Sequence, residues 1–216
     1  MNKITVLAEK NSVIQQFLTE IRDKRIQTDR LRFNRNIERI GEILAYELSK
    51  ELVYKDVETE TPLTTTSTKI LTTQPVIASV LRAGLPLQQG IANYFDNADR
   101  AFISAYRKYL DDSSFEIELD YLASPKLKGR TLIFADPMLA TGKSALLTLN
   151  SLLSKGEPAH THIVAVVASR QGLANLNANL KNVSFWIGAV DDALNSHSYI
   201  VPGLGDAGDL AFGLKE

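Results

Sequence analysis

From residue 76 onwards, short apolar runs rich in β-branched residues alternate with longer segments of helical periodicity. The apolar runs cover residues 76–80, 101–105, 131–135, 163–168 and 184–189, and the helical patterns cover residues 85–95, 144–153 and 173–180. Near-continuous apolar strands separated by helices predict an α/β fold with a mostly parallel sheet flanked by helices. Ligands of such sheets bind beyond the carboxyl ends of the strands, so functional residues are expected directly after each strand.

The other segments predict a helical beginning and an exposed β segment. Apolar residues recur at spacings of three and four, as on one face of a helix, at Ile37, Ile40, Leu44, Leu48 and Leu52. Thr28 and Asp29 precede this pattern and suit its N-cap. Residues 115–122 alternate as in an exposed antiparallel strand or arm, and the Thr-rich residues 64–68 indicate a surface loop or an edge strand. We expect a single domain, 1–216, with helices at about 12–53 and a core at about 70–190.

Composition excludes several classes of protein. The chain has no cysteine, which excludes disulfides, thiolate metal sites and cysteine catalysis. Its formal net charge of -1 provides no overall basic field for nucleic acid or anionic lipid. The N-terminus lacks the apolar core of a signal peptide, and no apolar run has the length of a membrane span. We therefore expect a soluble, cytoplasmic protein that binds neither membrane nor nucleic acid.

A strand followed by a turn of small residues and a helix predicts a phosphate site at residues 136–144. Asp136 follows the apolar run, and Ala140, Thr141 and Gly142 are small enough for the backbone to wrap closely round a phosphate. A helix beginning near Ser144 adds backbone N–H groups and a positive dipole end. The nucleotide-triphosphate P-loop is excluded because Pro137 stands where that motif needs glycine. An ordinary capped strand–helix turn is the alternative.

Two arginines follow neighbouring strands. Arg82 comes directly after the run at 76–80, ahead of a turn at Gly84, and Arg107 follows the run at 101–105. Because a guanidinium forms a planar fork that suits a diphosphate, the pair could converge on one polyanion. The alternative is two surface arginines in ordinary ion pairs.

Residues 199–209 form a shaped loop. They contain three glycines and one proline, which excludes a helix or a regular strand interior. Asp206 and Asp209 give this loop carboxylates that could take part in binding or chemistry, and a structural Ω-loop is the alternative. Glycine turns of this kind expose backbone N–H and C=O groups that a ligand can reach.

Three segments resemble uracil phosphoribosyltransferases, in the same order along the chain. They are LRAGL at 81–85, DPMLATG at 136–142 and PGLGDAGD at 202–209. The resemblance begins weakly at 28–30, ends at 212–213, and implies a type I phosphoribosyltransferase fold with a C-terminal base-binding hood over residues 199–213 and a β-arm. It implies a pentosyltransferase that joins uracil to 5-phosphoribosyl 1-diphosphate (PRPP), giving UMP and pyrophosphate with Mg²⁺ as cofactor.

The resemblance also assigns the site residues. It implies that Arg82 and Arg107 grip the pyrophosphate and that Asp136 contacts the ribose hydroxyls, the three forming the catalytic set. PRPP binding would extend over Arg82, Arg107, Asp136, Pro137, Met138, Leu139, Ala140, Thr141, Gly142, Lys143, Ser144 and Asp206. Uracil would meet Ile200, Gly205, Asp206 and Ala207. Backbone groups exposed by the glycine turns suit its two carbonyls and the intervening N–H, and such a site would reject cytosine, whose amino group reverses one position. Mg²⁺ would be held through PRPP, with Asp206 as its candidate protein ligand. It further implies a homodimer or larger homo-oligomer and a possible GTP activator.

Some features depart from the family or leave alternatives open. The family usually has glycine where this chain has Lys143, and Ala-Pro-Glu where it has residues 169–171. Asp191 and Asp192 either face the site or cap the next turn, and His160, His162 and His197 are interpreted as surface or structural residues. The alternative functions are an RNA-binding regulator of pyrimidine genes on the same fold, a transferase for another base, and an inactive scaffold.

Overall fold

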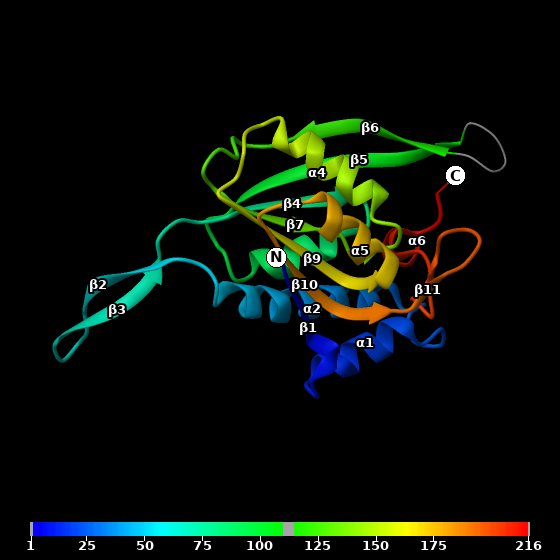
Figure 1. The fold of residues 1–216 in the computed structure, drawn as a ribbon. Helices are drawn as coiled ribbons and strands as arrows, with labels where there is room; N and C mark the ends of the chain where they lie inside the picture. The colour runs from blue at the N-terminus through cyan, green and yellow to red at the C-terminus, as the bar shows by residue number, and fades with distance from the viewer. Residues whose placement is uncertain (1, 110–114, 216) are drawn as a thin grey trace.

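A computed structural model describes residues 2–109 and 115–215, with side chains described for 2–104 and 120–215. Its centre is an eight-stranded sheet in the order β1-β10-β9-β7-β4-β5-β6, with β8 pairing β9 (Figure 1). The strands are β1 (Lys3–Val6), β4 (Val76–Leu81), β5 (Asp99–Tyr109), β6 (Phe115–Ala123), β7 (Thr131–Ala135), β8 (Met138–Leu139), β9 (His160–Ser169) and β10 (Val183–Asp191). The pairings are parallel except that of β5 with β6, so the expected mostly parallel sheet is confirmed.

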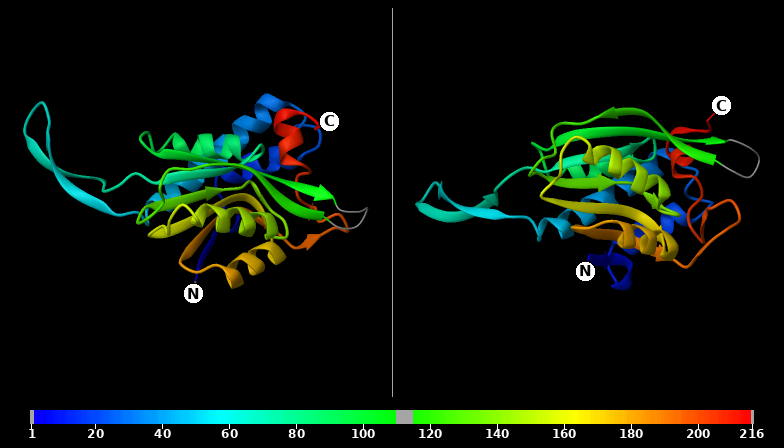
Figure 2. Two further views of the ribbon diagram at one scale, coloured as in Figure 1. Left: turned by 90° about the horizontal axis from the view of Figure 1, so that it is seen from above. Right: turned by 45° about the horizontal axis from the view of Figure 1, so that its top comes forward.

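Helices cover both faces of this sheet (Figures 1 and 2). One face carries α1 (Ile14–Arg22), α2 (Arg30–Ser49), α3 (Gly84–Ala92) and α6 (Ala207–Phe212), and the other carries α4 (Lys143–Leu153) and α5 (Arg170–Asn179). A short 3-10 turn, η1 (Leu7–Glu9), follows β1. Each side of the sheet therefore has its own apolar cluster, because the buried strands present apolar side chains in both directions.

The predicted N-terminal helix is α2. Asp29 caps it, with its side chain accepting a hydrogen bond from Arg32 N at 3.0 Å. The helix ends at Ser49, so Leu52, which was expected on its apolar face, lies beyond it. Glycines let α2 and α3 approach closely: a Cβ on Gly90 would lie 2.0 Å from the carbonyl oxygen of Glu38.

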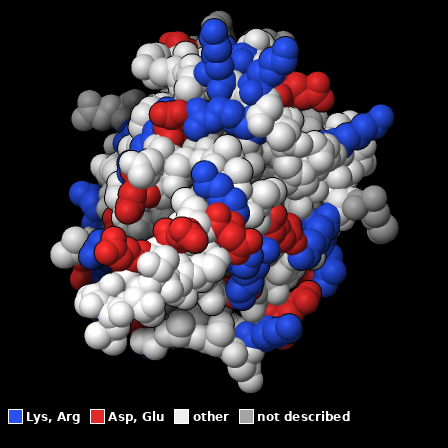
Figure 3. Space-filling model, turned by 90° about the vertical axis from the view of Figure 1, so that its left-hand side faces the viewer, with Lys and Arg blue, Asp and Glu red and all other residues white. Residues whose placement is uncertain are grey.

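A hairpin of β2 (Tyr54–Glu60) and β3 (Thr65–Leu71) projects away from the body (Figure 1). The Thr-rich stretch at 64–68 thus belongs to an arm rather than a loop. Residues 115–122, predicted as an exposed antiparallel strand or arm, form the antiparallel edge strand β6 of the main sheet, in agreement with the first of these alternatives. On the side of the molecule that bears this arm, acidic and basic side chains are interspersed (Figure 3). Among the described residues, no helix has the length and apolar character needed to cross a membrane.

Candidate active site

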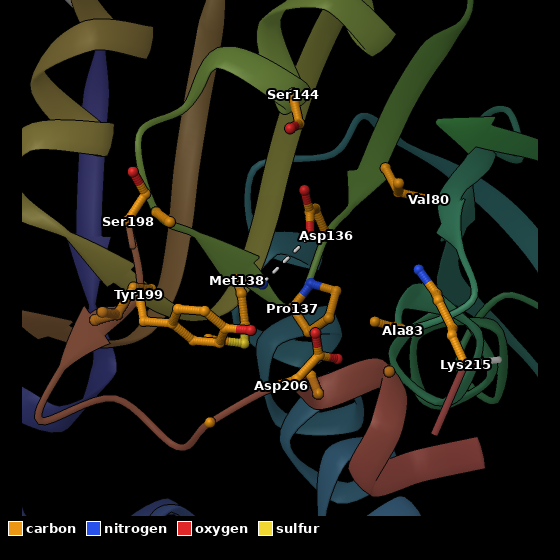
Figure 4. A pocket seen from close by; sticks show the side chains of 15 residues that line it. Val80, Ala83, Asp136, Pro137, Met138, Ser144, Ser198, Tyr199, Asp206 and Lys215 are labelled. Carbon is orange, nitrogen blue, oxygen red and sulfur yellow. Dashed lines mark hydrogen bonds between the residues drawn. The ribbon is translucent and has the colours of Figure 1, made fainter. Parts of the chain in front are cut away.

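A cavity of about 530 Å³ lies at the carboxyl ends of β4 and β7 (Figure 4). Its other wall comes from the C-terminal part of the chain, where β11 (Ala193–Leu194) and β12 (Ile200–Val201) form a small hairpin ahead of α6. The lining residues are Val80, Ala83, Asp136, Pro137, Met138, Ala140, Ser144, Ser198, Tyr199, Ile200, Gly205, Asp206, Ala207, Gly208 and Lys215. The cavity thus joins the segment predicted to bind phosphate to the glycine-rich C-terminal segment, at the edge of the sheet where ligands were expected.

The first wall is the segment from β7 to α4. Asp136 directly follows β7, and its carboxylate accepts a hydrogen bond from Met138 N at 3.3 Å (dashed in Figure 4). The carbonyl oxygen of Pro137 accepts from Val166 N and Val167 N on β9, at 3.1 and 3.0 Å. Gly142 has a positive φ of 75° and precedes the first residue of α4. The chain therefore turns within a few residues from strand to helix, which leaves the first N–H groups of α4 beside the cavity.

This turn is supported by Ser169 at the end of β9 and by Gly172 and Asn175 in α5. Ser169 Oγ donates to the carbonyl oxygen of Ala140 at 2.5 Å and accepts from Gly172 N at 2.8 Å. A Cβ on Gly172 would lie 2.3 Å from that same Ala140 oxygen, so only glycine allows the approach. Asn175 Nδ2 donates to the carbonyl oxygen of Thr141 at 2.9 Å. Residues 169–171, which depart from the family pattern, thus belong to the segment that supports residues 140–142.

Asp136 is the perturbed acid of the cavity. Burial raises its pKa to about 6, while the hydrogen bond from Met138 N lowers it. Asp206 lies on the other side of Pro137 (Figure 4), and its side chain accepts from Asp209 N at 3.0 Å to cap α6. Two carboxylates therefore face one space, which suits the binding of hydroxyl groups and of a cation.

The second wall is the loop from β12 to α6. Ile200 and Ala207 are buried, and Gly203 and Gly205 have positive φ values of 59° and 97°. A Cβ on Gly203 would lie 2.1 Å from the carbonyl oxygen of Ile200, so the turn is too tight for any side chain. This loop presents mostly backbone to the cavity, and the ring of Tyr199 lies beside Met138 (Figure 4).

The family model for uracil phosphoribosyltransferase matches residues 8–214. The chain belongs to the uracil phosphoribosyltransferase family. It is 48% identical over 210 residues to a uracil phosphoribosyltransferase of Porphyromonas gingivalis, covering 97% of both chains. It is 38% identical to a uracil phosphoribosyltransferase of Methanothermobacter thermautotrophicus, covering 94% of this chain and 93% of the relative. The structure is similar to the AQ2163 protein from Aquifex aeolicus, with a TM-score of 0.86, 28% identity and 98% of each chain covered.

The segment expected to bind phosphate, residues 136–144, is only partly exposed to the cavity. Asp136, Pro137, Met138, Ala140 and Ser144 line it, as expected for PRPP-binding residues. Leu139 is 1% exposed and packs in the core, so its side chain is directed away from the cavity. Thr141, Gly142 and Lys143 are not among the lining residues, although they lie between two that are.

Arg82 is placed differently from the expectation. It follows β4, but its Nη2 donates to Asp209 Oδ1 at 3.1 Å and to the carbonyl oxygen of Gly213 at 3.2 Å. Its side chain therefore lies against α6, beside the cavity wall rather than in it. Its Nε is buried and has no hydrogen-bond partner in the described part of the chain. The backbone of Arg107 lies in β5, but its side chain lies outside the described residues.

The four residues expected at the base, Ile200, Gly205, Asp206 and Ala207, all line the cavity. Sequence reasoning missed Lys215, whose side chain enters on the same side as Val80 and Ala83 (Figure 4). Its position beyond α6 gave no signal, because it belongs to none of the motifs of the uracil phosphoribosyltransferase family quoted above. Ser198 was missed for the same reason.

The histidines do not line the cavity: His160 and His162 lie apart from it, and the exposed His197 directly precedes the lining residue Ser198. His160 and His162 lie on β9, where His162 Nδ1 accepts a hydrogen bond from Trp186 Nε1 at 3.0 Å. Burial lowers the pKa of His162 to about 3, so the ring is neutral at pH 7. No group of three or more His, Asp or Glu side chains suited to a metal occurs among the described residues.

Proposed function

We propose that this protein transfers the phosphoribosyl group of PRPP to N1 of uracil, giving UMP and pyrophosphate in pyrimidine salvage. The observation that carries the proposal is a single cavity with two different walls. One is a strand–turn–helix segment suited to phosphate, and the other is a glycine-rich loop that presents backbone. A reaction that joins a sugar phosphate to a base needs both walls in one space.

PRPP would lie along the first wall. Ala140, Thr141, Gly142, Lys143 and Ser144 would hold the 5-phosphate through N–H groups at the start of α4, two hydroxyls and one ammonium group. Pro137, Met138 and Leu139 are assigned to PRPP on the family resemblance and would shape the wall beside it, since Pro137 has no N–H and its carbonyl oxygen is hydrogen-bonded to β9.

Asp136 would accept hydrogen bonds from the ribose hydroxyls. Its carboxylate is half-buried at the cavity wall, where a sugar hydroxyl can replace lost solvent. Lys215 would add a cation on the side of the cavity formed by the turn after β4.

The pyrophosphate would be gripped by Arg82 and Arg107. Among the residues that the structure describes, the buried Nε of Arg82 has no hydrogen-bond partner, which is a costly state that an incoming phosphate oxygen would relieve. To reach a substrate in the cavity, the Arg82 guanidinium would exchange Asp209 for the diphosphate. Arg107 is assigned on the family resemblance.

Uracil would lie against the second wall, at Ile200, Gly205, Asp206 and Ala207. The positive φ of Gly205 and the absence of its side chain leave backbone groups open to the base. Backbone donors and acceptors in fixed positions would accept the two carbonyls and N3–H of uracil and reject cytosine.

Mg²⁺ suits this site as a partner of PRPP rather than as a resident ion. Mg²⁺ is commonly held by one or two carboxylates together with substrate phosphates, and Asp206 is a cavity carboxylate in a suitable place. When bound, it would neutralise charge on the diphosphate.

The chemical step would exchange one bond for another at C1 of the ribose. The C1–O bond to pyrophosphate breaks, N1 of uracil bonds to C1 from the opposite face, and the N1 proton is released. Positive charge that develops on the ribose would be tolerated beside the carboxylate of Asp136. Acceleration would come from positioning and from stabilising the leaving diphosphate.

The test is product formation from labelled uracil with PRPP and Mg²⁺, with cytosine and hypoxanthine as parallel acceptors. UMP from uracil alone is the expected result. Product from hypoxanthine but not uracil would replace the base assignment, and no product from any base, with or without GTP, would overturn the proposal.

The catalytic role of Arg82 has its own test. We expect Arg82→Ala to reduce kcat by about 100-fold or more, as is typical when a group that stabilises transition-state charge is removed. Arg82→Lys, which keeps the charge and loses the fork, should be intermediate. Near-normal turnover of folded Arg82→Ala would contradict the role.

Assembly and regulation complete the proposal. We expect a cytoplasmic homodimer or larger homo-oligomer, to be measured by light scattering of the purified protein. Initial rates with and without GTP would show whether GTP activates it.

A further inference from the structure

We call residues 202–206, which connect β12 to α6, the base loop. An ion pair between two distant parts of the chain holds it. Arg22 is the last residue of α1 and Asp191 is the last residue of β10. Their side chains form two hydrogen bonds, Nη1 to Oδ2 at 2.8 Å and Nη2 to Oδ1 at 2.9 Å. The Asp191 side chain is 8% exposed and that of Arg22 is 21% exposed. This is a bidentate, largely buried pair, the geometry in which an arginine–carboxylate contact is most specific.

Both members of the pair also hold the backbone of Gly203. Asp191 Oδ2 accepts from Gly203 N at 2.9 Å, and Arg22 Nη1 donates to the carbonyl oxygen of Gly203 at 3.0 Å. Gln27 adds a third contact, donating through Nε2 to the carbonyl oxygen of Leu204 at 3.0 Å and to that of Ile21 at 2.8 Å. We call Arg22, Asp191 and Gln27 the loop brace.

The loop brace acts on residues next to the cavity without lining it. Gly203 and Leu204 directly precede Gly205 and Asp206, which line the cavity, whereas no member of the brace does. Gly203 and Gly205 have positive φ values, and glycines lose more conformational freedom on ordering than other residues. A loop of this kind keeps one shape only when outside contacts fix it.

We propose that Arg22 and Asp191 are positioning residues that fix the base loop in the shape that reads uracil. This inference rests on the proposed function for the identity of the base, whereas the positioning of the loop can be measured without it. The pair would set the affinity for the base and the discrimination against cytosine, and would leave the contacts with PRPP unchanged.

The next residue in the chain provides a matched control. Asp192 also forms an ion pair with an arginine, Arg170, but the two side chains are 80% and 73% exposed. An exposed pair of this kind contributes little, so Asp192→Asn makes the same chemical change beside Asp191 without touching the base loop.

A second control separates positioning from the general stability of α1. Glu20, also on α1, is 8% exposed and accepts from Arg32 Nε at 2.9 Å and Nη2 at 2.7 Å. Glu20→Gln therefore breaks a comparable arginine–carboxylate pair on the same helix, away from residues 203–204.

The experiment compares Asp191→Asn, Asp192→Asn and Glu20→Gln in steady-state kinetics with uracil and PRPP varied separately. We expect Asp191→Asn to raise KM for uracil by about 10- to 100-fold, as when a partner that orients a binding group is lost. KM for PRPP should stay within about threefold, less than the tenfold that 1.4 kcal/mol represents. Arg22→Lys, which keeps the charge but not the two parallel bonds, should fall between wild type and Asp191→Asn.

Hydrogen exchange of residues 200–208 without substrate gives a readout that does not depend on activity. Asp191→Asn should speed this exchange, and the two controls should not. An unchanged KM for uracil with unchanged exchange would overturn the inference, as would an equal rise in both KM values or an equal effect of Glu20→Gln. If the wild-type protein makes no UMP, the proposed function fails, and the exchange of residues 200–208 alone then decides whether the brace positions the loop.

Discussion

The two walls of the cavity are held in place by different kinds of contact. Residues 140–142 are supported by close backbone packing against α5, where Gly172 allows an approach that any Cβ would prevent. Residues 203–204 are held by side chains, through the Arg22–Asp191 pair and Gln27. The first support is mainly steric, with uncharged hydrogen bonds from Ser169 and Asn175 across 29 and 34 positions of the chain. The second depends on a charged pair and joins Arg22 to residues 169 and 181 positions away.

This difference teaches which changes each wall should tolerate. A steric support fails when volume is added, because a packed backbone has no room to move. A charged support fails when one partner is removed, because the other charge is left buried. Added volume near α5 should therefore weaken the binding of PRPP, and loss of a charge in the loop brace should weaken the binding of uracil.

The largest expected effect comes from Gly172→Ala. The new Cβ would lie 2.3 Å from the Ala140 oxygen and 2.6 Å from that of Leu139, so the phosphate wall must shift. We expect KM for PRPP to rise by about 100-fold, since 1 Å displacements at a site can cost that much. Steady-state kinetics would measure this rise, and isothermal titration with PRPP and Mg²⁺ would measure the accompanying loss of affinity as Kd.

The control is Gly129→Ala. Gly129 also has a positive φ, of 73°, but no atom lies within 4 Å of the position its Cβ would take. It should lower stability by about 1 kcal/mol and leave both KM values unchanged. Equal kinetic effects of Gly172→Ala and Gly129→Ala would contradict the steric support of residues 140–142.

The next effect concerns Asp136 and pH. Burial raises the pKa of Asp136 to about 6, so in the free protein this carboxylate is protonated and loses its charge as the pH falls through 6. We expect kcat/KM for PRPP to fall below about pH 6 and Asp136→Asn to remove that dependence, at an activity lower by about tenfold or more. A persistent acidic limb in the variant would assign the titration to another group.

Stability should change in the opposite direction. A carboxyl whose folded pKa is raised contributes stability below its unfolded pKa of about 4, and this contribution is lost as pH rises through about 6. At pH 7 the charged form therefore destabilises the fold, and Asp136→Asn should raise Tm. A lower Tm would show that hydrogen bonds of the carboxylate outweigh its burial.

A smaller effect is expected at Lys215. Lys215→Ala removes one cation from the cavity wall and should raise KM for PRPP by about 3- to 10-fold, which corresponds to about 0.7–1.4 kcal/mol, the range of a single ordinary hydrogen bond. KM for uracil should not change. Lys155→Ala, an exposed lysine two residues after α4, is the control. A change confined to uracil would place Lys215 with the base wall.

The smallest expected effect is that of Ser169→Ala. It removes one hydrogen bond to Ala140 and one from Gly172, and it leaves the packing of Gly172 unchanged. We expect a loss of about 1 kcal/mol in unfolding free energy and an increase in KM for PRPP of no more than about threefold. An effect as large as that of Gly172→Ala would show that the support is polar rather than steric.

The sequence predicts most strands of the sheet and the first wall well because each of them is a continuous segment with its own local pattern. The run at 131–135, Asp136 and the small residues after it lie in one continuous segment, and the structure has the same order of strand, turn and helix. The four predicted base residues line the cavity because the glycine-rich loop is also contiguous.

What the sequence does not predict depends on contacts between distant segments. The orientation of Arg82 toward Asp209 follows from the packing of α6 against the turn after β4, which has no local pattern. Asp191 was left between two roles, and the structure shows that it binds Arg22 and the N–H of Gly203 instead of facing the cavity. The short strands β1 and β2 were missed because few residues or exposed polar residues carry them, whereas the edge-strand alternative for residues 64–68 agrees with β3.

The span of the loop brace has a consequence for how the molecule assembles. The phosphate wall and its support lie within residues 131–175, so a chain emerging from the ribosome can complete them while the remainder is being made. The brace joins residues separated by 169 positions, so α1 must wait for β10 and the turn at 203 before the base wall can close. Such long-range closures are among the slowest events in folding. The phosphate wall should therefore become ordered before the base wall, and a refolding experiment that follows hydrogen exchange of residues 136–144 and 200–208 separately should show protection appear in that order.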